Sequence, residues 1–253
     1  GTFDPTFNGI VTPTVYDKFF GYQTLVNDEQ SKMVPYKLQN SVIYRGKATV
    51  INGKFTFQFV VPKDISYQYG FGKISYFAKN EMTGANGYDN KIVIGGSSSQ
   101  KVKDDEGPTI DLYLNDDSWV FGGTTHPSPI ILCDVFDING INTVGNGIGR
   151  DITAIVDAGT EKEQIIVLND FYEADLNSYQ KGKIKYKIEN LSPGRHTLKI
   201  RIWDVFNNVS EDDTEFIVVS DEVLAIKNLL NFPNPFSTST TFHFDHNKAG
   251  QTL

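Results

Sequence analysis

Cys133 is the only cysteine among the 253 residues, so it is the only thiol that could act as a nucleophile. Such a thiol needs a base, usually a histidine, to become a thiolate. His126 lies close by in the sequence, and folding could bring His196 near. However, Cys133 stands in the stretch PIILCDVF, in phase with Ile131 and Val135. This phase predicts a strand with a buried apolar face, so we expect Cys133 to be an inert core residue.

A second possible site is the pair His243 and His246, which has the spacing H-x-x-H. On a helix this spacing would place both rings on one face, where they could bind a metal. The surrounding stretch TTFHFDH alternates like a strand, and an odd spacing sends strand side chains to opposite faces. We therefore expect two surface histidines and no metal.

The residues Asp134, Asp137 and Asn139 resemble part of a calcium-binding loop. An EF-hand needs a glutamate at the last position of its loop, and no glutamate stands there counting from either aspartate. Asn139-Gly140 is typical of a tight turn. A turn is the favoured interpretation, and an irregular calcium site remains the alternative.

Three glycines, Gly145, Gly147 and Gly149, give the spacing G-x-G-x-G. The dinucleotide-binding fingerprint requires a further glycine where this chain has Arg150, within a strand–turn–helix unit. The sequence thus predicts a tight loop here. No paired carboxylates, serine triad or zinc cluster stands out either, so we expect no catalytic residue, no cofactor and no metal.

The charge balance bears on which partners the chain can have. Its net charge is −8, and it has no strongly basic stretch. A nucleic-acid partner would call for a basic surface, so we expect none. No apolar run reaches the roughly 18 residues of a membrane helix, so we expect no direct membrane span.

The elements that must position these residues are strands. Asn52-Gly53 separates two alternating runs within 44–62, which predicts a hairpin with Phe55, Phe57, Phe59 and Val61 on its buried face. A second hairpin is predicted over 183–203, with its turn at 192–194. Many short strands with turns between them favour an all-β fold of tandem immunoglobulin-like antiparallel β-sandwiches.

Linker composition suggests how the chain is divided. The stretch GGSSSQKVKDDEG, residues 95–107, combines flexible and charged residues between two strand candidates. We predict one sandwich over 1–95, a linker over 96–106, a second sandwich over 107–220, and the incomplete start of a third β domain over 221–253. In that last part, strand 240–244 is expected to be unpaired or frayed.

Several stretches together resemble one protein family, the gingipain-like cysteine peptidases that act as sortases of the type IX secretion system in Bacteroidota. The resemblance is to the region downstream of the peptidase domain. The more specific stretches are the hairpin block 44–78 and the segment GINTVGNGIGRDI. The others are 7–18, 88–96, 107–116, the rest of 133–157, 193–208 and 231–242.

The last stretch contains a motif shared by C-terminal domains that this secretion system exports. Its residues are Asn231, Pro233, Asn234, Pro235 and Phe236.

The resemblance implies a parent protein on the outer face of the outer membrane. That parent would cleave the C-terminal signal from exported cargo and attach the cargo to the surface. Its partners would be a PorV-type outer-membrane barrel protein, other attachment-complex proteins and the cargo itself. The family's catalytic histidine and cysteine lie upstream of the region that this chain matches, and Cys133 does not match the nucleophile's context.

Three functions follow from these observations. The chain could be the structural and docking stalk of such a sortase, or a binding module of a Bacteroidota surface adhesin with ligand contacts in loops 137–150 or 121–129. It could also be an enzyme, which would need a site that the residues do not offer. The family motifs favour the stalk.

Overall fold

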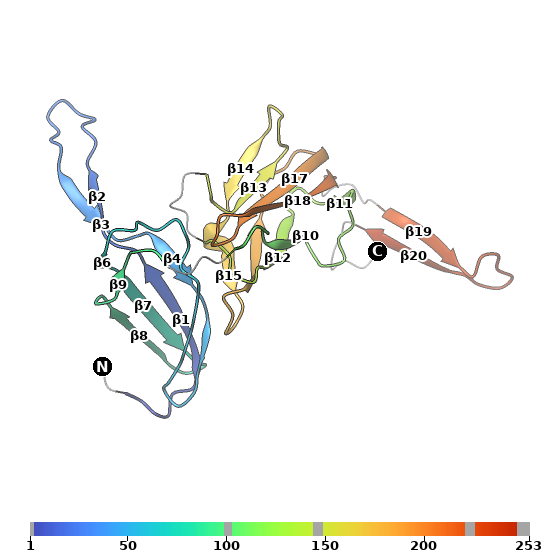
Figure 1. The fold of residues 1–253 in the computed structure, drawn as a ribbon. Coiled ribbons are helices and arrows are strands. Elements are labelled where there is room, and N and C mark those ends of the chain that lie inside the picture. The colour runs from blue at the N-terminus through green and yellow to red at the C-terminus, as the bar shows by residue number, and fades with distance from the viewer. Residues whose placement is uncertain (1–2, 99–102, 144–148, 221–225, 247–253) are drawn as a thin grey trace.

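The computed structural model describes residues 3–98, 103–143, 149–220 and 226–246. Within these ranges the chain forms strands and one short 3-10 turn, Asn169–Phe171, which confirms the all-β prediction. No helix of the described residues is long and apolar enough to cross a membrane. The strands fall into two larger units and one separate hairpin (Figure 1).

The first unit is built on one five-stranded sheet in the order β4-β1-β7-β8, with β5 also paired to β1. Two small antiparallel ribbons, β2–β3 and β6–β9, accompany it. The sheet strands are β1 (Gly9–Tyr16), β4 (Val42–Arg45), β5 (Ala48–Val50), β7 (Lys73–Lys79) and β8 (Gly84–Asp89). The ribbons are β2 (Phe20–Gln23) with β3 (Pro35–Leu38), and β6 (Gly70–Phe71) with β9 (Val93–Ile94).

The predicted hairpin around Asn52-Gly53 is half confirmed. Asn52 and Gly53 have φ angles of 52° and 73°, as a turn of the expected type requires. The second arm is not a paired strand, because its ladder ends at the bridge between Ile51 and Lys54. Phe57 and Phe59 pack against buried residues of the sheet instead. The prediction that Phe55 and Val61 are also buried is wrong, because they are 39% and 46% exposed. The segment 55–61 thus contacts the sheet through two partly buried rings and pairs with no described strand.

The second unit is a sandwich of two sheets with one continuous core. One sheet has the order β10-β12-β16-β15, and the other has the order β11-β18-β17-β13-β14. The first consists of β10 (Thr109–Leu114), β12 (Ile130–Phe136), β15 (Tyr172–Ala174) and β16 (Lys181–Lys187). The second consists of β11 (Gly123–Thr125), β13 (Thr153–Val156), β14 (Gln164–Val167), β17 (Gly194–Trp203) and β18 (Val209–Val218).

The predicted hairpin over 183–203 is wrong in its pairing, although both strands exist. β16 pairs with β12 and β15, whereas β17 pairs with β13 and β18, so the connection at 192–194 crosses from one sheet to the other. Alternation shows which side of a strand is buried, and it does not show which strand lies next to it.

A third element, the hairpin of β19 (Ile226–Phe232) and β20 (Thr241–His246), extends beyond the sandwich (Figure 1). The expectation that strand 240–244 is unpaired or frayed is wrong, because β20 pairs with β19. Neither strand joins a sheet of the other units within the described residues.

Several polar contacts join the first unit to the second. Asn177 N–H donates to Lys47 O at 2.8 Å, and the Asn177 side chain bonds the Thr49 backbone and hydroxyl at 2.8 Å each. Lys63 N–H donates to Val205 O at 3.0 Å. Each sheet lies within one of the predicted domains. The exact domain boundaries and the linker 96–106 remain a prediction.

A further group of contacts lies around Asp64, whose side chain is 6% exposed. Its carboxylate pairs with Arg150 and accepts a hydrogen bond from Asn142 Nδ2 at 3.1 Å. Lys63 adds a cation–π contact with Phe206, at 4.6 Å from the ring centroid. These contacts bury charge between the two units, so the units are joined by more than the chain connection.

Candidate functional site

Cys133 lies in the middle of β12, where it is 1% exposed. Burial raises the pKa of its thiol, and the charges of Asp134, Asp212 and Asp111 raise it further. A thiol in this setting stays protonated and is a poor nucleophile. The interpretation of Cys133 as a core residue is therefore confirmed.

The histidines named beside Cys133 are engaged elsewhere. On β17, in the opposite sheet, His196 places Nδ1 2.8 Å from Asp157 Oδ2 and Nε2 2.7 Å from Ser192 O. His126 Nδ1 accepts the N–H of Ser128 at 3.1 Å. The described residues thus show no Cys–His pair of the kind a cysteine peptidase uses.

The buried thiol leads to a prediction about reactivity. We expect iodoacetamide to label Cys133 in the native chain only as fast as the chain unfolds, and to label it at once in denaturant, because burial and a raised pKa both block attack. Asp117→Cys places a thiol on the exposed surface and serves as the control, which reacts immediately. Rapid native labelling of Cys133, measured by mass spectrometry, would contradict its burial.

His243 and His246 both lie on β20, which has the strand conformation that the alternation predicts. His243 is exposed, and the His246 ring lies 6.2 Å from that of Phe244. Neither belongs to a group of three possible metal ligands among the described residues.

The turn at Asn139-Gly140 is present, and Asp137 holds it. Asp137 Oδ1 accepts the backbone N–H groups of Asn139 at 2.7 Å and Gly140 at 2.8 Å. Asp134 points to a different neighbour, since its Oδ1 pairs with Lys183 across the sheet at 2.7 Å. The three residues first considered for calcium therefore do not form one group.

A different acidic group forms around Asp137. Carboxylate oxygens of Asp104, Asp137 and Asp204 all lie within 4.8 Å of one another. Sequence spacing could not show this group, because its members come from the segment before β10, the turn after β12 and the turn after β17. Asn139 Nδ2 donates to Asp104 Oδ2 at 2.6 Å, and Asn208 Nδ2 donates to Asp204 Oδ2 at 2.8 Å.

The electrostatics of this group follow from burial and like charge. Burial is the main cause that raises the pKa of Asp137, and the charge of Asp104 adds to it. Burial likewise raises the pKa of Asp204, with further contributions from Asp137 and Asp104. Hydrogen bonds from Asn139, Gly140 and Asn208 act in the opposite direction. Carboxylate oxygens suit Ca²⁺ or Mg²⁺, and the three aspartates would supply part of the about six to eight oxygens that calcium binds.

Repulsion within the group gives a second prediction. Without added divalent cations, we expect Asp104→Asn to raise the free energy of unfolding by roughly 0.5 kcal/mol at neutral pH, because one of three like charges is removed while the shape is kept. A carboxyl whose pKa is raised in the folded state destabilises the fold while it is charged. As the pH falls and it takes up a proton, the repulsion that the variant removes disappears in the unmodified chain as well. The advantage of the variant should therefore shrink as the pH falls toward about 4.

Chemical denaturation in the presence of EDTA measures this difference. Asp111→Asn, on the exposed side of β10, is the matched control and should change little. A clear loss of stability in Asp104→Asn would mean that the hydrogen bond from Asn139 outweighs the repulsion.

The predicted glycine loop is only partly visible. Gly145 and Gly147 lie outside the described residues, and Gly149 has a φ of 79°, in the region that glycine favours.

The ribbon β2–β3 is the central part of an arm, residues 17–40, that projects from the first unit (Figure 1). By strand alternation, Phe20, Tyr22, Tyr36 and Leu38 share one face, and each is 36% exposed or more. The rings of Tyr22 and Tyr36 stack at 5.7 Å. The arm therefore presents an apolar face to solvent.

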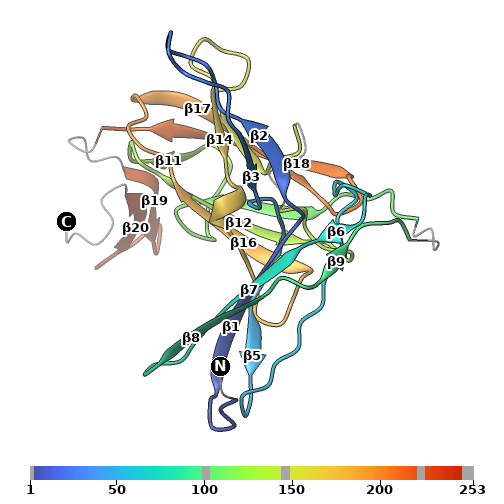
Figure 2. The ribbon, with the colours of Figure 1, turned by 90° about the vertical axis from the view of Figure 1, so that its left-hand side faces the viewer.

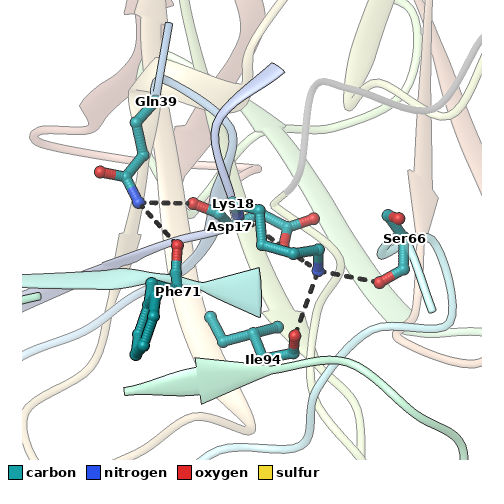
Figure 3. A network of polar contacts seen from close by, with 6 residues as sticks. All are labelled: Asp17, Lys18, Gln39, Ser66, Phe71 and Ile94. Carbon is teal, nitrogen blue, oxygen red and sulfur yellow. Dashed lines mark hydrogen bonds and ion pairs between the residues drawn. The ribbon is translucent and has the colours of Figure 1, made fainter. Parts of the chain in front are cut away.

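A polar network holds the root of the arm (Figure 3). Lys18 Nζ pairs with Asp17 Oδ1 at 2.7 Å and donates to Ser66 O at 2.9 Å. Gln39 Nε2 donates to Asp17 O at 3.0 Å and to Phe71 O at 3.3 Å. This network fixes both ends of the arm to the body of the first unit.

The secretion-type motif occupies the end of β19 and the start of the connection to β20. Asn234 Nδ2 donates to Asn231 Oδ1 at 3.2 Å, and Thr240 Oγ1 donates to Pro233 O at 2.9 Å. Phe236 is 55% exposed. The motif residues thus shape the hairpin connection at the surface.

No protein-family model matches the chain, and no curated protein matches it either. Among solved structures, the chain is similar to PorU from Porphyromonas gingivalis, described as dimeric and latent. The two share 34% identity over 99% of this chain, and the match spans 23% of the PorU chain. The TM-score is 0.46, which is too low for the superposition to establish a common spatial arrangement. The similarity is therefore one of sequence. It points to the same family that the sequence motifs resemble.

Proposed function

We propose that this chain is the non-catalytic C-terminal β-sandwich region of a PorU-like sortase of the type IX secretion system. In this role it is a stalk that holds an upstream cysteine peptidase domain at the outer surface of the outer membrane. The family motifs in the sequence support this assignment. The burial of Cys133 supports the absence of peptidase chemistry in this region.

The observation that carries the proposal is that several polar contacts join the two units. A spacer must keep a fixed length and angle, and units linked by a flexible connection alone move relative to each other. Here Asn177, Lys63 and Asp64 each make polar contacts across the junction. The Asp64 side chain is nearly buried at 6% exposure, whereas its partner Arg150 is 37% exposed.

Exposed apolar surface supports the docking part of the proposal. The β2–β3 arm carries an apolar face on a fixed root, and such a patch on a soluble domain commonly marks an interaction site. The proposed partners are a PorV-type outer-membrane barrel protein, other attachment-complex proteins and, through the parent, exported cargo.

The junction offers a direct test in the parent protein. We expect Asp64→Ala to leave cleavage of a short soluble peptide unchanged and to reduce cargo attachment at the cell surface, because only the second activity needs the fixed spacing. Asp170→Ala serves as the control. Asp170 also faces the other unit, near Arg45, but its side chain is 89% exposed. Small-angle scattering shows whether the variant has lost the contacts between the units. If it has, and cargo attachment is unchanged, the stalk role is wrong.

The second candidate function is a binding module of a Bacteroidota surface adhesin. Val120 and Phe121, at and beside the loop 121–129, are 71% and 61% exposed, and exposed apolar loop residues favour a ligand contact. An adhesin would lose ligand binding on Phe121→Ala and would have no peptidase upstream.

A further inference from the structure

The short strand β11 has one free edge. It is the last strand of its sheet and, among the described strands, pairs only with β18, in parallel. Val219 N–H donates to Thr125 O at 3.0 Å, so Thr125 turns its backbone groups toward β18. Successive residues of a strand face opposite sides. The N–H and C=O of Thr124 therefore face away from the sheet, where no described strand pairs with them.

Beside this edge lies a cavity of about 600 Å³. Its walls come from β11, from residues on either side of it in the sequence and from the hairpin β19–β20. Both views place this hairpin close to β11 (Figures 1 and 2). The volume falls within the range of roughly 300–1,000 Å³ that is typical of ligand sites.

The hydroxyl of Thr124 lines the cavity and is buried without a hydrogen-bond partner. Buried polar atoms in proteins are bonded in the great majority of cases, so an unbonded hydroxyl at a cavity wall is an uncommon feature. It stands on the same residue whose N–H and C=O pair with no described strand.

The charges of the walls restrict the ligand. Asp116, Asp245, His126 and His246 line the cavity, and its described lining residues include no lysine or arginine. Trp119, Val120 and Phe244 supply apolar surface. The site therefore complements a cationic group next to apolar side chains, and it repels an acidic ligand.

We propose that an extended basic peptide segment of a partner protein adds to β11 as an extra strand. Its backbone pairs with the N–H and C=O of Thr124, a lysine or arginine reaches Asp116 or Asp245, and apolar side chains cover Val120. Strand addition to a free sheet edge is a common mode of peptide recognition. The inference rests on the proposed docking function and gives one docking contact its chemistry.

Binding to the purified chain tests the inference. The probe is the capped hexapeptide acetyl-KVKVKV-amide, compared with acetyl-EVEVEV-amide and with a backbone N-methylated form of the lysine peptide. Calorimetry and tryptophan fluorescence report binding. We expect the lysine peptide to bind at least about tenfold more tightly than either control, because one lacks the charge match and the other cannot pair with the edge. Equal affinities for all three, or no binding at all, would overturn the inference.

Variants locate the site. Thr124→Val should keep the melting temperature, because the hydroxyl has no partner to lose, and should weaken the lysine peptide about fivefold. Thr124→Pro removes the outward N–H and should abolish strand pairing.

Asp116→Asn should weaken binding of the lysine peptide and make that binding depend less on salt. Thr109→Val, on the edge strand of the opposite sheet, is the matched control and should bind as the unmodified chain does.

The outcomes separate this inference from the proposed function. If Thr124→Val and Thr109→Val bind alike, the β11 site is wrong, and the stalk role can still stand. If the parent proves to have no peptidase while the peptide binds as expected, the stalk role is wrong, and the β11 site remains.

Discussion

Replacing Phe216 with alanine is expected to lower the free energy of unfolding by about 3 to 5 kcal/mol. Phe216 lies on β18, is 0% exposed and stacks on His196 at 5.5 Å between ring centroids. It is among the largest fully buried side chains of the described residues. Alanine would lose the burial of the ring and leave a cavity that the rigid sheets cannot close.

Urea unfolding followed by fluorescence measures this loss. Phe121→Ala is the matched control, because Phe121 is 61% exposed and its removal should change stability by less than about 0.5 kcal/mol. A loss of under about 1 kcal/mol in Phe216→Ala would mean that the two sheets do not pack around this ring.

Lys18→Met is expected to destabilise the first unit by about 3 kcal/mol. The side chains of Lys18 and Asp17 are 12% and 2% exposed, so methionine would fill the space but leave the Asp17 charge buried without its cation. The carbonyls of Ser66 and Ile94 would lose the same donor. Hydrogen exchange should rise across the arm, residues 17–40, because its root is no longer fixed (Figure 3).

Lys37→Met, on the exposed strand β3 of the same arm, controls for the loss of a lysine as such. It should leave both the melting temperature and the exchange rates nearly unchanged. If Lys18→Met behaved in the same way, the network at the arm's root would contribute little and the arm would not be held in a fixed direction.

Features set by neighbouring residues could be predicted from the sequence. Alternation around Cys133 predicted a strand with one buried face, and the structure has the strand Ile130–Phe136 there, because one face of a half-buried strand is apolar at every second residue. Asn52-Gly53 predicted its turn because both residues accept positive φ angles. Both features depend on a few residues in sequence order.

Features that depend on distant residues could not be predicted. The second arm of the first hairpin, Phe55–Val61, alternates like a strand, but its rings pack on the sheet and leave its backbone unpaired. The partners of β16 and β17 depend on sheet-to-sheet packing, which alternation does not encode.

The acidic group and the junction between the units were missed for the same reason. Asp104, Asp137 and Asp204 each look like ordinary turn residues in their own segments. Asp64 and Arg150 are far apart in sequence and carry no motif that links them. Only the folded chain brings these side chains together.

The stalk role is tested most directly on the native protein. An antibody raised to this chain would capture its parent from outer membranes, and mass spectrometry with a cysteine-peptidase active-site probe would then be applied. The account predicts a parent much heavier than this chain's 28.3 kDa that carries the probe on a cysteine upstream of Gly1. A parent that never reacts with the probe, and instead retains a host or glycan ligand, would contradict the stalk role and favour the adhesin.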